Sequence, residues 1–419
     1  MFSNKFIKAS DGYSTYTHFV PAPYFRKSFE IKKSVKKCVL TITGLGFYDA
    51  YINGRKITKG ILAPYISNPD DIVYYDEYDL TPYVSDGKNI LGIHLGNGML
   101  NSVGGGIWDL DEALYRSAPQ TAFSIETEYT DGSNSFEEAD ENVKTADSPV
   151  LFDDLRCGCF YDARNEIDGW ADIDFDDSNW KNAMRAMPVR GEKKLCTAEA
   201  IKPQRIIKPV KIRKCVLKDY HPRGNVTKEY KDFPSKEHDG FLYDFGINTA
   251  GTVSLKISGE RGRQIDLQFG EYYATDGEPD TSNICFCPDG YSQRDIYILK
   301  GEGTEKFEPV FTYHGFRYCV VLGITEEEAT ADLLEFIVYS SDIKELGSFS
   351  CSDDTANALQ KMTRNSDLSN FYYFPTDCPH REKNGWTGDA ALSCEHVLMN
   401  LDAVNSYKEW LNNLRAAQR

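Results

Sequence analysis

KCVLTITGLGFYDAYINGRKI, residues 37–57, alternates apolar with polar side chains over two short runs and places Asn53-Gly54 between strand-like segments. Alternation with a period of two is typical of strands that bury one face. Asn-Gly favours a two-residue hairpin turn, because both residues tolerate positive φ. The stretch therefore predicts antiparallel β-structure with a tight turn at residues 53 and 54.

The neighbouring sequence extends this pattern. DIVYYDEYDLTPYV (71–84) and NILGIHLGNGM (89–99) are again short apolar runs interrupted by Asp, Gly and Pro, without a useful helical period. A second strand-rich block runs from about 207 to 340. Two antiparallel sandwiches follow from this spacing of strands and turns.

Two segments between these blocks differ in composition. Residues 131–200 are rich in acids and Asn, punctuated by aromatics, and we expect irregular surface structure there. IKPQRIIKPVKI (201–212) has two prolines flanked by basic residues, which is typical of a crossing between domains.

After Gly347 the apolar period becomes helical. SDDTANALQKMTRNSDLSN (352–370) opens with residues that favour helix N-caps. Three apolar stripes follow in order: Thr355, Leu359 and Met362; Ala390, Ala391, Cys394, Val397, Leu398 and Leu401; and Val404, Tyr407, Trp410, Leu411 and Leu414. Strands that give way to consecutive helices indicate separate domains.

The amino-acid composition limits the classes of molecule that the protein is expected to bind. The 419 residues include 47 Lys+Arg and 64 Asp+Glu, a formal charge of −17 that disfavours nucleic acid and anionic membranes as partners. Neutral sugars fit such a surface. The 11 scattered cysteines suit a reducing compartment, and the N-terminal residues show neither a signal-peptide pattern nor a membrane span. We therefore expect a cytoplasmic protein.

Metal sites are disfavoured by spacing. The pairs Cys157/Cys159 and Cys285/Cys287 are CxC, the wrong spacing for common zinc ribbons, and are expected to be free thiols. His94, His314 and His396 have no acid or Cys partners at ligand spacing, which favours core or surface roles. No cofactor is expected, with a structural calcium in a sandwich loop left open.

The densest group of chemically active residues is TDCPHREKNGWTGD (376–389). Pro375, Pro379, Gly385 and Gly388 predict a loop between the first two helices. Asp377, Glu382 and Asp389 could converge with Arg381 and Trp386 on a neutral polyol, since carboxylates accept hydroxyl hydrogen bonds and Trp presents a flat apolar face. A raised carboxyl pKa would suit glycoside hydrolysis. A helix-capping, salt-bridged surface loop is the alternative from the local pattern.

This loop resembles the signature of the bacterial α-L-rhamnosidases of glycoside hydrolase family 78, in which Asp-Cys-Pro-x-Arg is followed by an acid and by Gly-Trp-x-Gly-Asp. The resemblance covers nearly the whole chain. The matching stretches are GLGFYDAYINGRKI, LAPYISNPDDIVYYDEYDLTPYV, NILGIHLGNGM, YDARNEIDGW, DSNW, YDFGINTAGTVSLKISGERG, GEYY and RDIYILKGEGTEKFEPVFTYHGFRY.

The resemblance implies roles for individual residues. Glu382 would be the general acid, Asp377 and Asp389 would bind sugar hydroxyls, and Arg381 and Trp386 would shape the same subsite. Many family members have a further acidic residue between the Arg and the catalytic Glu, and a Gln in place of His380. The family's general base lies far downstream, and neither Glu395 nor Glu409 sits in a matching motif.

The expected fold is mainly β with a C-terminal helical segment: two β-sandwich domains, at 1–205 and 206–343, and the first helices of a truncated (α/α)6 catalytic barrel at 344–419. The expected function is inverting release of terminal L-rhamnose from rhamnose-containing glycosides, with this chain incomplete and inactive alone. Exposed helical faces would favour self-association. The alternative is a non-catalytic carbohydrate-binding protein built from the two sandwiches; a purely structural interaction protein ranks last, because it leaves the acids of the loop unexplained.

Overall fold

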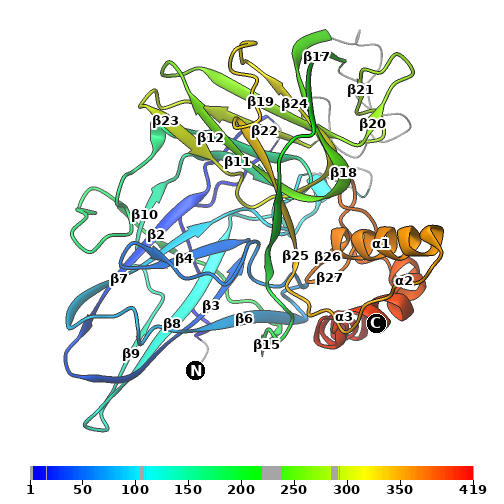
Figure 1. Ribbon diagram of the computed structural model, residues 1–419. Helices are drawn as coiled ribbons and strands as arrows, with labels where there is room; N and C mark the ends of the chain where they lie inside the picture. The colour runs from blue at the N-terminus through cyan, green and yellow to red at the C-terminus, as the bar shows by residue number, and fades with distance from the viewer. Residues whose placement is uncertain are drawn as a thin grey trace.

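The computed structural model describes residues 3–418, except for residue 16, residues 104–107, residue 109, residues 219–236, residues 285–290 and residue 292. Two β-sandwich regions lie one above the other in Figure 1, and three helices pack beside them. The pair Cys285/Cys287 lies outside the described residues. Among those described, no helix is both long and apolar enough to cross a membrane.

The first sandwich consists of two sheets. One has the strand order β14 (Met184–Arg185), β1 (Ile7–Lys8), β8 (Gln120–Tyr129), β3 (Val35–Leu45), β6 (Ile72–Asp79) and β15 (Glu192–Leu195), with β9 (Asn134–Glu138) paired to β8. The other has the order β13 (Lys181–Asn182), β10 (Lys144–Asp147), β2 (Pro23–Ile31), β7 (Gly87–Leu95), β4 (Tyr48–Ile52) and β5 (Arg55–Lys56). Their inward side chains, such as Phe25, Leu40, Ile93 and Phe123, form one buried core.

The opening stretch passes from one sheet to the other. β3 pairs with β6 and β8, whereas β4 pairs with β5 and β7. Gly46 lies between them at φ 134°, where a Cβ atom would approach the Gly96 carbonyl oxygen to 2.2 Å. The hairpin is confirmed: Asn53 and Gly54 have φ of 51° and 82° and join β4 to β5.

The second sandwich is built from one ten-stranded sheet that folds around its own core. Its order is β11 (Val150–Asp154), β12 (Gly158–Asp162), β22 (Arg294–Ile298), β19 (Gln264–Gly270), β24 (His314–Leu322), β18 (Glu237–Ser258), β25 (Leu334–Ser341) and β16 (Ile201–Ile207). β17 (Lys211–Lys218) and β23 (Thr304–Phe307) pair with β18, and β20 (Tyr272–Tyr273) pairs with β21 (Pro279–Asp280).

β18 allows this sheet to close on itself. Its first half pairs with β24, its register shifts between Asp244 and Thr249, and its second half pairs with β25 and β23. A shift of this kind bends a strand and increases its twist. The enclosed core includes Tyr243, Val253 and Leu255 of β18 itself. The fold prediction of strand-rich sandwiches followed by helices is confirmed.

Two segments contain more regular structure than their composition suggests. Most of residues 131–200 is irregular, as expected, but short strands from β9 to β15 and the 3-10 turn Ala163–Asn165 interrupt it. Residues 201–207 form β16, an edge strand on β25 whose register shifts between Pro203 and Arg205. Proline is tolerated there because an edge strand leaves one side of its backbone unpaired. The domain boundary near residue 205 stays a prediction. β11 and β12 precede that boundary in the sequence but belong to the ten-stranded sheet of the second sandwich.

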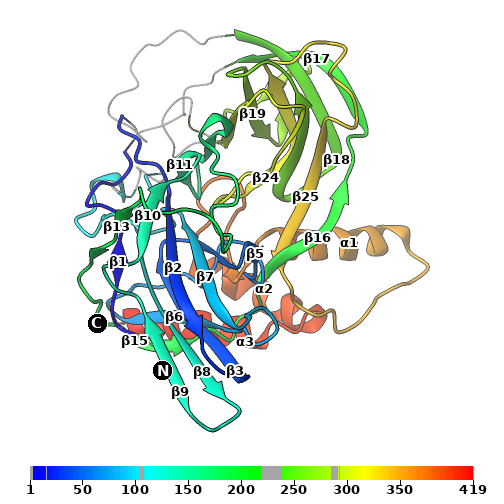
Figure 2. The same cartoon turned by 90° about the vertical axis from the view of Figure 1, so that its left-hand side faces the viewer.

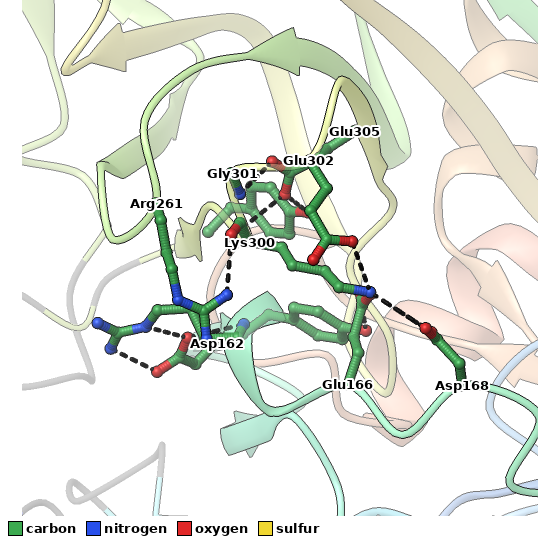
Figure 3. A network of polar contacts seen from close by, with 11 residues as sticks. Asp162, Glu166, Asp168, Arg261, Lys300, Gly301, Glu302 and Glu305 are labelled. Carbon is green, nitrogen blue, oxygen red and sulfur yellow. Dashed lines mark hydrogen bonds and ion pairs between the residues drawn. The ribbon is translucent and has the colours of Figure 1, made fainter.

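A polar network fastens the segment after β12 to the second sandwich (Figure 3). The Lys300 ammonium lies 3.6 Å from the Glu166 carboxylate and 3.3 Å from that of Asp168. The Glu305 carboxylate accepts the backbone N–H groups of Lys300 and Gly301, both at 2.8 Å. These contacts hold residues 161–170, one of the stretches that carry the family resemblance, against the turn after β22.

The helices are α1 (Asp354–Ser369), α2 (Thr387–Asn400) and α3 (Val404–Ala417), which lie together in both ribbon views (Figure 2). The Asp353 side chain caps α1 by accepting the N–H groups of Thr355 and Ala356. A small core joins them, made by Ile343, Phe371, Val397, Leu401, Ala403 and Tyr407. Several side chains of the predicted apolar stripes do not contribute to that core. Those that are exposed are Leu359, Met362, Leu398, Val404 and Leu411.

Candidate active site

The candidate site is the loop between α1 and α2, as the sequence predicted. After α1 a short hairpin forms from β26 (Phe371–Tyr372) and β27 (Phe374–Pro375), and the loop then runs to Trp386, the residue before α2. The Asp377 N–H donates to the Asn384 carbonyl oxygen over 2.9 Å, which closes the loop on itself. Tertiary contacts, not helix capping, hold it: α2 has no side-chain hydrogen bond at its N-cap.

Glu382 and Trp386 are paired directly. The Trp386 indole Nε1–H donates to Glu382 Oε2 over 2.6 Å. Glu382 is half-buried and Trp386 is exposed, so the carboxyl group sits at the surface of the loop with one oxygen engaged. No described residue forms a hydrogen bond or ion pair with the other oxygen.

The two aspartates differ in their surroundings. One Asp377 carboxylate oxygen accepts the Asn384 N–H at 2.9 Å, and the other accepts the Cys378 thiol at 3.0 Å. Asp389 lies in the first turn of α2, is exposed, and makes no hydrogen bond or ion pair with any described residue. Asp377 therefore supports the loop in this state, whereas the acceptor atoms of Asp389 are free for a ligand.

Arg381 lies near Glu271, a residue of the second sandwich that approaches the loop at His380. The Glu271 carboxylate accepts the side-chain amides of Asn248 at 2.8 Å and Asn283 at 3.1 Å. Burial raises the pKa of Glu271, and the positive charge of Arg381 partly offsets that effect. Arg381 therefore acts on Glu271, a residue that the sequence alone did not single out.

His380 is enclosed beside this carboxylate. Its Nε2 lies 3.6 Å from Glu271 Oε2, and its Nδ1 has no hydrogen-bond partner among the residues that the structure describes. Burial, with the nearby charges of Arg381 and Lys383, lowers the pKa of His380 to about 3. The imidazole is consequently neutral near pH 7 and acts as a packing group.

Two buried cations hold the loop to the sandwiches. Arg156, in the turn between β11 and β12, is 1% exposed; its Nε donates to the Glu382 carbonyl oxygen and a terminal nitrogen donates to Asn384 Oδ1, both over 2.8 Å. Lys383 is 2% exposed, and its Nζ donates to the backbone carbonyls of Leu155 and Tyr313. The segment from Glu382 to Asn384 is thus held to the sandwiches by two buried cations.

Neither cation could be singled out from the sequence. Arg156 lies in DDLRCGC, which contains no recognisable pattern, and is separated from Glu382 by 226 residues. Lys383 stands inside the motif, where a lysine is normally expected to be exposed. Its positive φ of 55° was also not foreseen.

The remaining candidates have structural surroundings. Cys157 and Cys159 are buried free thiols. His94 contacts Ser148 and His314 contacts Asp295, both in the interior, whereas His396 contacts Asp367 between α2 and α1. In the part of the chain that the structure describes, no group of three or more His, Cys, Asp and Glu side chains is arranged to hold a metal ion.

Of the two downstream acids, Glu395 is exposed on α2 and Glu409 is buried on α3. The Glu409 carboxylate accepts hydrogen bonds from Tyr74, Lys194 and Thr197 at 2.9, 2.6 and 2.5 Å. These donors all come from the first sandwich region and the segment after it. Glu409 therefore anchors α3, and its oxygens are occupied.

Comparison with known proteins gives three consecutive family matches. Residues 33–208 match the alpha-L-rhamnosidase N-terminal domain, residues 235–339 the bacterial alpha-L-rhamnosidase concanavalin-like domain, and residues 344–419 the bacterial alpha-L-rhamnosidase 6 hairpin glycosidase domain. An alpha-L-rhamnosidase of Formosa agariphila is 36% identical over 94% of this chain and 39% of its own length. One from Streptomyces avermitilis is 30% identical over 92% of this chain and 35% of its own length.

Solved structures of alpha-L-rhamnosidases have the same fold over the matched region. The alpha-L-rhamnosidase of Dictyoglomus thermophilum superposes with a TM-score of 0.85 and 34% identity, over 99% of this chain and 44% of that one. The Streptomyces avermitilis enzyme in complex with L-rhamnose gives a TM-score of 0.82 at 27% identity, over 95% of this chain and 36% of that one. The chain thus spans about two-fifths of the length of such relatives. Over that span, the chain belongs to the bacterial alpha-L-rhamnosidases of glycoside hydrolase family 78.

Proposed function

We propose that this chain provides the proton-donor side of an α-L-rhamnosidase that releases terminal L-rhamnose with inversion. The observation that supports this most is the pairing of Glu382 with the Trp386 indole at 2.6 Å, in a loop whose backbone is held by two buried cations. A carboxyl group fixed in this way can protonate a glycosidic oxygen that reaches its second oxygen atom.

In this proposal the other loop residues bind the sugar or support the loop. The Asp389 carboxylate accepts hydroxyl hydrogen bonds from the sugar, and Asp377 holds the loop through Asn384 while contributing an acceptor at its edge. The Trp386 ring covers an apolar face of the sugar. Arg381 balances the charge of Glu271 behind the loop.

Inversion also requires a second carboxylate that activates water. The Glu409 carboxylate accepts hydrogen bonds from four side chains and Glu395 lies exposed on α2, so we assign this role to neither. We therefore propose that another part of the family's helical domain supplies the general base, and we expect this chain alone to be inactive. We place the protein in the cytoplasm, a reducing compartment where the nine described free cysteines would be stable.

The proposal is tested by calorimetric titration of the chain with L-rhamnose. Asp389→Asn should weaken binding about tenfold, because it replaces a charged acceptor by an amide with weaker hydrogen bonds. Asp377→Asn should weaken binding and also lower the melting temperature, because its carboxylate holds the loop.

Asp353→Asn is the matched control, since Asp353 caps α1 outside the loop and Asn caps helices equally well. Rhamnose affinity that is the same in all three variants and the parent chain would contradict the proposed site. In that case binding would belong to the sandwiches, as in the non-catalytic alternative.

A further inference from the structure

Arg156 contacts the candidate loop at two points. Its Nε donates to the Glu382 carbonyl oxygen and a terminal nitrogen donates to the Asn384 side-chain oxygen, both over 2.8 Å. Asn384 is in turn joined to Asp377 twice: its N–H donates to the Asp377 carboxylate, and its carbonyl oxygen accepts the Asp377 N–H, both over 2.9 Å. One guanidinium group therefore links the residue of the proposed proton donor to the residue of a proposed sugar-binding carboxylate.

We propose that Arg156 is a positioning residue of the glycosidase, which fixes the carboxyl groups of Glu382 and Asp377 relative to each other. The proposal rests on the proposed function, in which Glu382 protonates the glycosidic oxygen and Asp377 contributes an acceptor for the same sugar. The two groups can act together only when their separation suits one bound sugar, and a misplacement of about 1 Å can cost about 10²-fold in rate.

A buried carboxylate holds the turn that carries Arg156. Asp154, the last residue of β11, is fully buried, and one of its carboxylate oxygens accepts the N–H groups of Arg156 and Cys157 at 2.8 and 2.9 Å. The other oxygen accepts the Ser102 hydroxyl at 2.9 Å and the Val103 N–H at 2.8 Å. These contacts fix the backbone of Arg156 independently of the loop.

The Arg156 side chain is enclosed as well. It is 1% exposed, its other terminal nitrogen donates to the Ser102 hydroxyl oxygen at 3.0 Å, and its guanidinium carbon lies 5.8 Å from the Trp108 ring centroid. Acceptors in three directions suit the planar fork of an arginine, whereas a lysine has one compact ammonium group on a flexible stem. Arg156→Lys therefore keeps the positive charge but cannot make all three contacts.

Arg26 provides a matched control. It is also 1% exposed, and its guanidinium donates to the Asp177 carboxylate at 2.7 Å and to the carbonyl oxygens of Trp170 and Phe175 at 3.1 Å. These partners all lie outside the loop. Arg26→Lys thus removes a comparable set of buried hydrogen bonds, so it should lower the melting temperature as Arg156→Lys does and leave the loop unchanged.

The first measurement follows Glu382 through the indole resonances of the chain labelled with ¹⁵N-tryptophan. The chain has five tryptophans, and Trp386→Phe assigns the Trp386 resonance. Because the Trp386 indole N–H donates to Glu382 Oε2 over 2.6 Å, its proton should resonate downfield and should move upfield when this hydrogen bond is lost. Arg156→Lys should cause that upfield movement, and Arg26→Lys should not. Asn384→Ala removes only the acceptor on the loop and should act in the same direction, which keeps the test decisive if Arg156→Lys does not fold.

The second measurement is calorimetric titration with L-rhamnose. Arg156→Lys should weaken binding about tenfold, the effect of roughly one hydrogen bond to a charged group, whereas Arg26→Lys should bind like the parent chain. The inference is overturned if the Trp386 resonance stays in place in Arg156→Lys and Asn384→Ala, or if both arginine variants have the same effect on rhamnose affinity. If the parent chain binds no rhamnose, the proposed function fails, and the Trp386 resonance alone then decides whether Arg156 positions Glu382.

Discussion

At the scale of single residues, His380 makes the stability of the loop depend on pH. Burial holds the pKa of His380 at about 3, below the ordinary value of 6.5, so the folded state binds the proton less readily than the unfolded state. Its stabilising contribution is complete above pH 6.5 and is lost as the pH falls towards 3. The loss is at most about 1.4 kcal/mol per pH unit.

His380→Gln should remove this dependence, because Gln does not titrate. Denaturant unfolding between pH 7 and pH 4 should show a smaller decline in the free energy of unfolding for this variant than for the parent chain. His18→Gln, at an exposed position, is the control. Parallel declines in the parent and the His380→Gln variant would show that His380 is not held neutral.

The sequence gathers the candidate residues of the loop but does not reveal what supports the loop. Asp377, Glu382, Trp386 and Asp389 stand within one motif, and the roles that the resemblance implies for them stay predictions. Arg156 and Glu271 reach the loop from turns that are distant in the sequence, and only the folded topology brings them there. The different states of the two aspartates could not be predicted either, because they depend on backbone N–H groups that the loop turns inward.

At the scale of elements, α3 is docked through Glu409. Burial alone would raise the pKa of this carboxyl, but hydrogen bonds from Lys194, Thr197 and Tyr74 outweigh it and the pKa is lowered. Glu409→Gln should reduce the free energy of unfolding by about 2 kcal/mol at pH 7, since it leaves buried donors poorly paired.

The pH dependence gives a further check on Glu409. A lowered pKa stabilises the fold above the ordinary value of 4.5, and this contribution disappears as the pH falls below it, so the parent and the variant should converge in acid. Glu395→Gln on exposed α2 is the control and should unfold like the parent. A Glu409→Gln variant as stable as the parent at pH 7 would show that α3 is held by its apolar contacts alone.

Local sequence signals predict some of the secondary-structure elements but not others. The hairpin at Asn53-Gly54 and the three helices follow from local signals of turn chemistry and period. Several short strands between residues 131 and 200 do not, because partners of these strands lie far away in the sequence: β10 pairs with β2, and β12 with β22. Acidic, Asn-rich sequence becomes strand there because a neighbouring edge is available.

At the scale of the whole molecule, the helices present a large apolar surface. Leu392 is 86% exposed, Met399 69%, Met362 62%, Leu359 59% and Leu411 53%. Burial of such a side chain contributes about 1.5–3 kcal/mol, so association through these faces is favoured. We predict concentration-dependent self-association of the chain, measured by light scattering after gel filtration.

Leu392→Glu combined with Met399→Glu should shift the chain towards monomer. The control is Phe136→Ser, which removes an exposed aromatic from β9 on the first sandwich. A chain that is monomeric at all concentrations, or one whose association responds only to Phe136→Ser, would contradict the assignment of the associating surface to the helices.

The role of Glu382 as proton donor is tested most directly by leaving-group dependence. The parent chain and Glu382→Gln are assayed on phenyl and dinitrophenyl α-L-rhamnosides, with and without a second polypeptide comprising the part of the Formosa agariphila relative beyond the matched region. We predict no hydrolysis by the chain alone. With the second polypeptide, Glu382→Gln should lose about 10²–10⁴-fold on the phenyl substrate and far less on the dinitrophenyl substrate, which leaves without protonation. Equal losses on both substrates, or hydrolysis by the chain alone that Glu382→Gln does not change, would contradict the assignment.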